Sequence, residues 1–207
     1  MAVLALSGTA NAGILFSNLG YGSANGQAID GLDSAAASFS TDGSSHTLAD
    51  VILSLEQISS GGHLTVGLYS DSGSQTPGSS LVTPGTIPDS SLSVGSYSNQ
   101  TVGGGNYALA ANTRYWVVLT GTSAVAPDAY WNREQGWTNG VGLSGQYVAF
   151  TSSGGSWFSG PLNADHTPLV MQVDVDGAST PEPSTVLTAL AGLGALAVFR
   201  YRSRRTA

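Results

Sequence analysis

The chain of 207 residues predicts an all-β fold, a two-sheet antiparallel sandwich of jelly-roll-like type. Between residues 13 and 176, short apolar runs alternate with gaps rich in Gly, Ser, Asp and Pro, which is the composition of turns. The runs favour the two-residue period of half-buried strands, and we find no convincing 3.6-residue apolar face there. A segment of roughly 165 residues is long enough to enclose one core.

Two runs define the strand pattern most clearly. Apolar residues occupy positions 51, 53 and 55, and the same spacing recurs at 64, 66 and 68. Gly61 and Gly62 lie between these runs, so we expect a hairpin there. Further strands are expected at residues 13–19, 36–40, 92–97, 106–109, 115–120, 129–132, 146–151 and 169–175.

The composition excludes several classes of protein. Charged residues make up 9% of the chain and its formal net charge is -7, so it lacks the basic surface that nucleic-acid binding needs. The absence of cysteine excludes a disulfide-stapled domain and a cysteine-based zinc site. The chain also contains no lysine, and four of its six arginines lie in the last eight residues.

Charge is therefore divided unevenly along the chain. Residues 13–180 hold twelve acidic residues and two arginines, a net of -10, whereas residues 181–207 hold four arginines and one glutamate, a net of +3. A short segment of opposite charge at one end of a chain indicates a sorting or interaction segment.

This C-terminal segment has three parts in order. It begins with Pro181-Glu182-Pro183-Ser184, continues with an uncharged run at residues 185–199, and ends in an arginine cluster. The cluster consists of Arg200, Arg202, Arg204 and Arg205. The run predicts one short transmembrane helix of about 22 Å, which spans the bilayer with snorkelling flanks and local thinning. The arginines place the C-terminus in the cytoplasm by the positive-inside rule.

The ordered tail resembles a PEP-CTERM sorting signal over roughly residues 181–205. The resemblance implies a Gram-negative bacterium, an inner-membrane precursor, and processing by an exosortase that recognises Pro181, Glu182 and Pro183. It also implies a final location on the cell surface or outside the cell, in association with exopolysaccharide. The four arginines are then the topology signal that stops transfer through the membrane.

The N-terminus predicts the matching export signal. Residues 1–12 contain a short apolar piece and end in Ala10-Asn11-Ala12, which has the form of a signal-peptidase site. The alternative is that residues 3–6 form an ordinary first strand. The expected organisation is a signal-peptide remnant (1–12), a β-sandwich domain (13–177), a linker with the PEP motif (178–184), a transmembrane helix (185–199) and an arginine-rich cytoplasmic tail (200–207).

Two stretches of the central region resemble the choice-of-anchor R domain of bacterial surface proteins. They are residues 67–73, which lead to Pro77-Gly78, and residues 107–121. The resemblance implies an extracellular β domain with no established catalytic residues. Because no G-x-S-x-G motif occurs and His46, His63 and His166 are far apart in sequence, we expect a non-enzymatic protein with no catalytic residues. A hydrolase that uses paired carboxylates is the weakest alternative.

Two kinds of binding site remain as candidates. Asp30 and Asp33 flank a turn, and Asp174 and Asp176 share one face of a strand, so these four are candidate Ca²⁺ ligands, although no cofactor is required.

Aromatic residues suggest a carbohydrate-binding module for exopolysaccharide as the alternative function. Tyr130, Trp131, Trp137 and Trp157 lie in a Gly-rich region that also holds Asn, Gln and Arg, the residue types that stack on sugars and hydrogen-bond to them. The competing interpretation is that Trp131 and Trp157 fill the core and Trp137 covers an edge.

Overall fold

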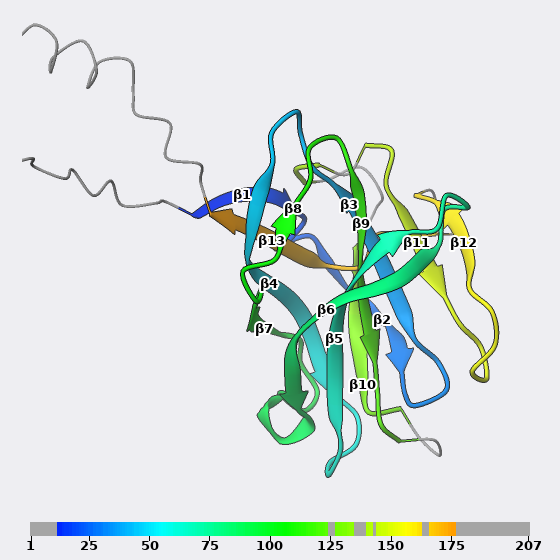
Figure 1. Ribbon diagram of the computed structural model, residues 1–207. Coiled ribbons are helices and arrows are strands. Elements are labelled where there is room, and N and C mark those ends of the chain that lie inside the picture. The colour runs from blue at the N-terminus through cyan, green and yellow to red at the C-terminus, as the bar shows by residue number, and fades with distance from the viewer. Residues whose placement is uncertain (1–11, 124–126, 135–139, 143, 163–165, 177–207) are drawn as a thin grey trace, which may run out of the picture. The chain divides into compact units, whose positions relative to one another are not determined.

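Alternating apolar side chains fold the chain into two facing antiparallel sheets, as the sequence predicts (Figure 1). The computed structural model describes residues 12–123, 127–134, 140–142, 144–162 and 166–176. Within them the helical content is one short 3-10 helix, η1 (Asp89–Ser91). The expected transmembrane helix at residues 185–199 and the signal remnant up to residue 11 lie outside the described residues.

Sheet A has seven strands, arranged around the long strand β4. In chain order they are β1 (Ala12–Ser17), β2 (Gly22–Ile29), β4 (His46–Gln57), β7 (Ser98–Gly103), β8 (Ala108–Leu109), β10 (Ala129–Glu134) and β13 (Met171–Asp176). The order across the sheet is β1-β13-β4-β10-β2, and β7 and β8 also pair with β4.

Sheet B has six strands and the order β12-β11-β3-β9-β5-β6. The strands are β3 (Ala35–Ser40), β5 (His63–Asp71), β6 (Pro77–Pro88), β9 (Arg114–Thr120), β11 (Tyr147–Phe150) and β12 (Phe158–Pro161). The chain crosses between the two sheets repeatedly, so strands that are neighbours in sequence often belong to different sheets.

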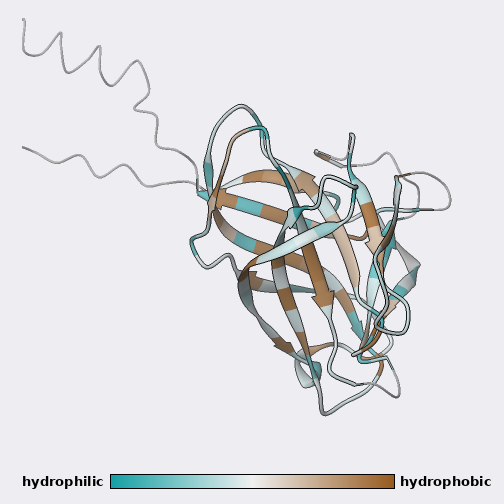
Figure 2. Cartoon of the chain, turned by 45° about the vertical axis from the view of Figure 1, so that its right-hand side comes forward, coloured by the Kyte–Doolittle hydropathy of each residue, from teal (hydrophilic) through white to brown (hydrophobic). Residues whose placement is uncertain are grey.

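The core lies between the sheets and is built from alternate residues of the strands. In β9, Tyr115, Val117 and Leu119 belong to the main core, whereas Trp116 and Val118 belong to a smaller cluster on the outer face of sheet B. In β13, Val173 and Val175 face the core, and the intervening Asp174 does not. Figure 2 shows the resulting alternation of apolar and polar residues along the strands.

The structure corrects the sequence-based strand assignment at several places. The hairpin expected at Gly61-Gly62 is wrong, because β4 belongs to sheet A and β5 to sheet B, so this turn crosses the sandwich. Residues 92–97 were expected to form a strand, but the strand begins only at Ser98. The strands β2, β6 and β12 were not expected. The Pro-Gly pairs at Pro77 and Pro84 belong to the Gly- and Pro-rich gaps that predict turns, but both prolines lie in β6, an edge strand where a missing N–H is tolerated.

Sheet A forks along one flank of β4. Val51 pairs with Val173 of β13, whereas Leu55 pairs with Trp131 of β10, so two strands follow one another along the same side of β4. At the junction, the Ser54 N–H donates to the carbonyl of Val170 (3.1 Å), and the Val170 N–H donates to the carbonyl of Asn132 (2.9 Å). Residues 168–170 therefore enter between β4 and β10.

Buried side chains complete the hydrogen bonding of this fork. The Trp131 indole N–H donates to the Val170 carbonyl (2.9 Å). Asn18 donates to the Leu169 carbonyl (3.2 Å) and to Glu134 Oε2 (3.1 Å), and it accepts from the Met171 N–H (2.8 Å). Because a buried backbone group without a partner is costly, these side chains stabilise the point where the sheet divides.

Gly104, which follows β7, packs closely against Leu48 of β4. A Cβ at Gly104 would lie 2.4 Å from Leu48 Cγ and 2.5 Å from the Leu48 carbonyl oxygen, whereas a Cβ at Gly103 would meet nothing within 4 Å. We expect Gly104→Ala to lower the free energy of unfolding by about 1–3 kcal/mol, because backbone must move. That corresponds to about 2–4 °C in Tm for each kcal/mol.

Gly103→Ala is the matched control, and we expect its Tm to stay close to that of the wild type. Differential scanning calorimetry of both variants makes the comparison. Equal Tm values for the two variants would show that this contact does not limit the packing.

Candidate functional site

The predicted aromatic site does not assemble as one surface. Trp131 is 0% exposed and belongs to the main core, and its indole N–H is used at the fork of sheet A. Trp131 therefore fills the core and cannot stack on a sugar at the surface. Trp137 lies outside the described residues.

Tyr130 and Trp157 lie on opposite sides of the sandwich. Ala129 and Trp131 face the core, so the half-buried Tyr130 between them faces outward from sheet A. Trp157 packs against the cluster on the outer face of sheet B. These two rings cannot contact the same sugar unit.

A groove at the edge of the sandwich brings together a different set of side chains. It has a volume of about 370 Å³, within the range of ligand sites. Sheet A contributes residues from β2 and β10, sheet B contributes residues from β11 and β12, and loops supply the rest. Its lining includes Gln27, Asp33, Arg133, Phe150, Phe158 and His166.

Arg133 is the central cation of this groove. Its guanidinium carbon lies 5.3 Å from the centre of the Phe150 ring, and Phe150 belongs to the main core. An Nη2–H donates to Gln27 Oε1, while Nε is buried and makes no hydrogen bond. Burial lowers the pKa of Arg133, because removal from water disfavours the charged form.

Aromatic and small residues shape the opposite wall. Phe158 is 52% exposed, and its ring centre lies 5.9 Å from that of Phe150. The His166 imidazole lies against Gly160 in β12, where a Cβ would come within 2.6–2.7 Å of the ring. Gly160 therefore leaves room for His166 at the wall of the groove.

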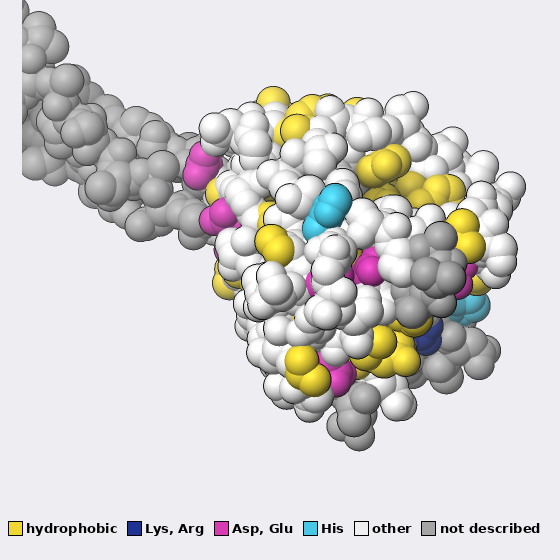
Figure 3. Space-filling model, turned by 90° about the horizontal axis from the view of Figure 1, so that it is seen from below, with side chains coloured by type: hydrophobic (Ala, Val, Ile, Leu, Met, Phe, Trp, Pro, Cys, Tyr) yellow, Lys and Arg dark blue, Asp and Glu magenta, His cyan; other side chains and the backbone are white. Residues whose placement is uncertain are grey.

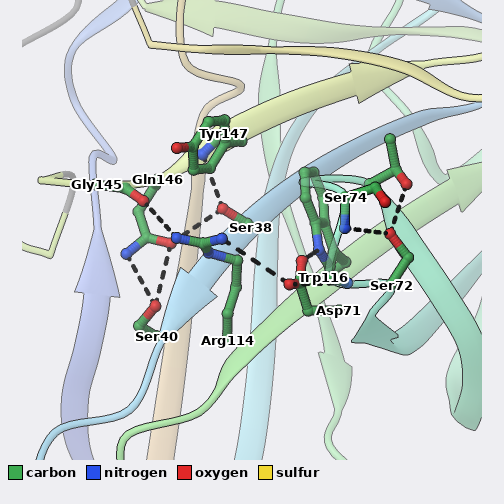
Figure 4. A network of polar contacts seen from close by, with 12 residues as sticks. Ser38, Ser40, Asp71, Ser72, Ser74, Arg114, Trp116, Gly145, Gln146 and Tyr147 are labelled. Atoms are coloured by element: carbon green, nitrogen blue, oxygen red, sulfur yellow. Dashed lines mark hydrogen bonds and ion pairs between the residues drawn. The ribbon is translucent and has the colours of Figure 1, made fainter.

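A polar network on the outer face of sheet B offers a contrast (Figure 4). The Arg114 guanidinium lies 4.7 Å from the centre of the Tyr147 ring, 3.9 Å from Asp71 Oδ2, and donates to the Gly145 carbonyl at 3.0 Å. The Trp116 indole N–H donates to Asp71 Oδ1 (2.8 Å). This cation has a carboxylate, a carbonyl and a ring as partners, so we interpret the network as structural.

The same network joins the two stretches that resemble the choice-of-anchor R domain. Asp71 comes from residues 67–73, and Arg114 and Trp116 come from residues 107–121. The strands that carry them, β5 and β9, are neighbours, and Tyr69 lies opposite Trp116. The contact gives both stretches a shared structural role.

The candidate Ca²⁺ ligands make local hydrogen bonds. Asp30 Oδ1 accepts from the backbone N–H groups of Leu32 (2.7 Å) and Asp33 (2.6 Å), and Asp33 Oδ1 accepts from the Ser153 N–H (2.7 Å). Asp174 accepts from Gln172. Asp176, at the end of β13, pairs with Thr47 in register.

The surroundings of Asp174 raise its pKa. Burial raises the pKa of Asp174, and the Asp50 carboxylate opposite it in β4 raises it further, against a hydrogen bond from Gln172. In the described part of the chain, no three carboxylates or imidazoles form a group that could hold a metal ion. The Ca²⁺ site stays a prediction.

A buried carboxyl pair, Asp89 and Asp128, was not expected from the sequence. Asp89 Oδ2 accepts from the Gly62 N–H (2.8 Å), while Asp89 Oδ1 is buried and has no hydrogen-bond partner. Asp128 Oδ2 accepts from the N–H groups of Thr122 (2.6 Å) and Ser123 (3.0 Å). Burial raises the pKa of Asp89, the Gly62 N–H lowers it, and the Asp128 carboxylate raises it again.

The surface of the molecule carries few charges. Figure 3 shows one face that is mostly uncharged, with acidic side chains in a few places and little basic area. In the first 199 residues, Arg114 and Arg133 are the only basic residues apart from histidine. The scarcity of basic residues is the feature of the sequence that could have marked Arg133 as a candidate site residue. No comparable feature marks Gln27 or Phe158.

The comparisons with known proteins concern the C-terminal segment. Residues 179–205 match the PEP-CTERM protein-sorting motif, which includes the predicted Pro181-Ser184 and arginine positions. The motif implies an anchored precursor that is processed by an exosortase at the membrane and exported to the cell surface. No curated protein matches the chain. Among the described residues, no helix is long and apolar enough to cross a membrane.

The raised pKa of Asp89 predicts how stability changes with pH. Protonated Asp89 holds its proton more tightly in the folded state than in the unfolded chain. The stabilisation that this protonation gives is complete below the unfolded pKa and is lost as pH rises through the folded pKa. We expect Asp89→Asn, which keeps an acceptor for the Gly62 N–H, to raise Tm near pH 7. The gain should shrink towards pH 3.

Asp42 provides a control of opposite sign. Hydrogen bonds from His46 and from the Ser44 N–H lower its pKa, so its contribution is present above the unfolded pKa and is lost on acidification. In thermal melts between pH 3 and pH 8, we expect Asp42→Asn to have a lower Tm than the wild type near neutral pH and a similar Tm near pH 3. A constant difference between Asp89→Asn and the wild type across this range would contradict the assignment.

Proposed function

We propose that this chain is a non-enzymatic surface or matrix protein that is exported, anchored briefly in the inner membrane by its C-terminal helix, and released by an exosortase at Pro181-Ser184. The observation that carries this proposal is the match of residues 179–205 to the PEP-CTERM protein-sorting motif. The net charge of -10 over residues 13–180 and of +3 over the tail fits a chain whose domain and tail have different roles. The domain remains soluble outside the cell, and the tail sets the topology.

A non-enzymatic role is supported by what the carboxylates of the domain do. Asp30, Asp33 and Asp128 accept hydrogen bonds from backbone N–H groups of loops, and Asp71 accepts from an indole N–H. Such contacts fix loop and strand geometry. Glu134 accepts from the buried Asn18. These groups act on the protein's own chain, which is the pattern of structural carboxylates.

The described domain supports a choice-of-anchor R-like extracellular module of jelly-roll-like form. Its strands cross repeatedly between two antiparallel sheets, and the two stretches that carry the resemblance meet on β5 and β9. Export begins with residues 1–12 as the remnant of a signal peptide.

The second candidate function is carbohydrate binding for exopolysaccharide, and the groove between β2 and β12 favours it. The groove places an exposed ring, Phe158, beside Arg133, Gln27 and Asp33. A flat apolar ring with hydrogen-bonding groups around it suits a sugar, whose C–H face is apolar and whose rim carries hydroxyl groups. This arrangement replaces the Tyr130–Trp157 surface expected from the sequence.

The sorting proposal predicts the fate of a C-terminal tag. In a host that expresses an exosortase, we expect the wild-type chain to lose the tag and to reach the surface or the medium. The combined change Pro181→Ala, Glu182→Ala and Pro183→Ala should leave the tag on a full-length inner-membrane protein. Fractionation and immunoblotting measure both.

A host without an exosortase is the control for this experiment, and the wild type should keep its tag there. If the wild type also keeps its tag in the exosortase-positive host, the processing proposal is wrong.

The binding proposal predicts an effect of Phe158→Ala on a glycan array. We expect the variant to lose at least about 1 kcal/mol of binding free energy, because an exposed ring that stacks on a ligand contributes beyond its area. Val94→Ala removes a 79%-exposed side chain that does not line the groove and is the matched control. Equal binding by the Phe158 and Val94 variants would exclude this groove.

A further inference from the structure

Arg133 stands where an apolar residue would ordinarily be. Its neighbours on the same face of β10, Ala129 and Trp131, belong to the main core. Gln27, which lies opposite Trp131 in β2, faces the same side of the sheet. The guanidinium of Arg133 therefore follows the core-facing side chains of Ala129 and Trp131 along β10, at the open edge between the sheets.

The charge of Arg133 is poorly compensated within the described structure. Its contacts among the described residues are the amide oxygen of Gln27 and the face of Phe150, both uncharged, and its buried Nε, like that of Arg114, makes no hydrogen bond. Among the described residues, the two ion pairs are His46–Asp42 and Arg114–Asp71. A partly buried cation without a carboxylate partner is costly, and Arg133 has none among the residues that the structure describes, so an anion bound in the groove would lower that cost.

Other groups in the groove suit a sugar that carries the anion. Phe158 presents a half-exposed ring to the groove. Asp33 Oδ1 accepts from the Ser153 N–H, which leaves Oδ2 to accept from a hydroxyl group, and Gln27 Oε1, which accepts from Arg133, has a second lone pair. Asp33 also limits the charge of the ligand, because a doubly charged phosphate would be repelled more strongly than a carboxylate. The surroundings therefore favour one negative charge on a ring with hydroxyl groups.

We propose that the groove binds a saccharide unit with a carboxylate group, a uronic acid residue, whose carboxylate pairs with the guanidinium of Arg133 while its ring stacks on Phe158. This inference rests on the carbohydrate-binding function proposed above and names its ligand class. A planar guanidinium matches a carboxylate with two parallel hydrogen bonds. The net charge of the domain is negative, so recognition depends on this short-range contact and not on general attraction.

Calorimetric titration of the full-length chain in detergent tests the proposal. The probes are trisaccharides of galacturonic, glucuronic and mannuronic acid, and a neutral galactose trisaccharide as reference. We expect at least one uronate to bind at least about tenfold more tightly than the neutral sugar, since a hydrogen bond to a charged group contributes more than a neutral one.

Two arginine variants with the same change of net charge separate the groove from the basic tail. Arg133→Gln should weaken uronate binding at least about tenfold, whereas Arg114→Gln should leave it unchanged. Arg133→Lys, which keeps the charge but loses the planar fork, should bind with intermediate affinity. The Tm of Arg133→Gln without ligand should equal or exceed that of the wild type, because the variant removes a poorly compensated cation.

The outcomes distinguish the failure of the uronate assignment from the failure of carbohydrate binding by the groove. Equal affinity for uronate and neutral trisaccharides, lost in Phe158→Ala but not in Arg133→Gln, would overturn the carboxylate assignment and leave carbohydrate binding intact. Uronate binding that Arg114→Gln reduces as much as Arg133→Gln would reflect net charge and would also overturn it. If none of the four trisaccharides binds, both the ligand class and the carbohydrate function of this groove are wrong.

Discussion

The fold depends on hydrogen-bond satisfaction where sheet A divides. One flank of β4 is shared by β13 and β10, so the segment before β13 enters a region from which water is excluded. Its carbonyl and N–H groups find partners in Ser54, Asn132, Trp131 and Asn18. Without these partners, the desolvation cost of the backbone would oppose the fork. A buried asparagine and a buried tryptophan thus act as parts of the sheet's hydrogen-bond ladder.

The groove follows from this fork. β10 leaves β4 after Trp131, and its pairing with β2 shifts register between Asn132 and Glu134. The next residue after Asn132 is Arg133, whose guanidinium therefore reaches the open edge between the sheets and lies over Phe150. Arg133 lies within this irregularity and keeps the face of Ala129 and Trp131. The fork that completes the core of sheet A thus leaves Arg133 as a lining residue of the groove.

The two arginines of the domain show how environment decides the role of a residue type. Arg114 is held by Asp71, Gly145 and Tyr147 on the outer face of sheet B, and its contacts tie neighbouring strands together. Arg133 has a neutral oxygen and a ring. Nothing in the residues that flank them in sequence separates these cases, because the partners come from other strands. The same is true of Trp131 and Trp157, which the sequence predicts to share one surface: Trp131 lies in the core between the sheets, and Trp157 packs on the outer face of sheet B.

The sequence by itself determined the all-β class, most strands and the sorting tail, since these depend on local periodicity, turn composition and an ordered motif of adjacent residues. It did not reveal that β4 and β5 lie in different sheets, or that β6 is an edge strand despite Pro77 and Pro84. The tertiary structure alone decided that Gln27, Arg133 and Phe158 share one groove. The physical reason is that strand pairing within a sheet joins residues more than a hundred positions apart, such as Gln27 and Arg133, and a local pattern carries no record of which distant strand will supply the partner of a given backbone group or charge.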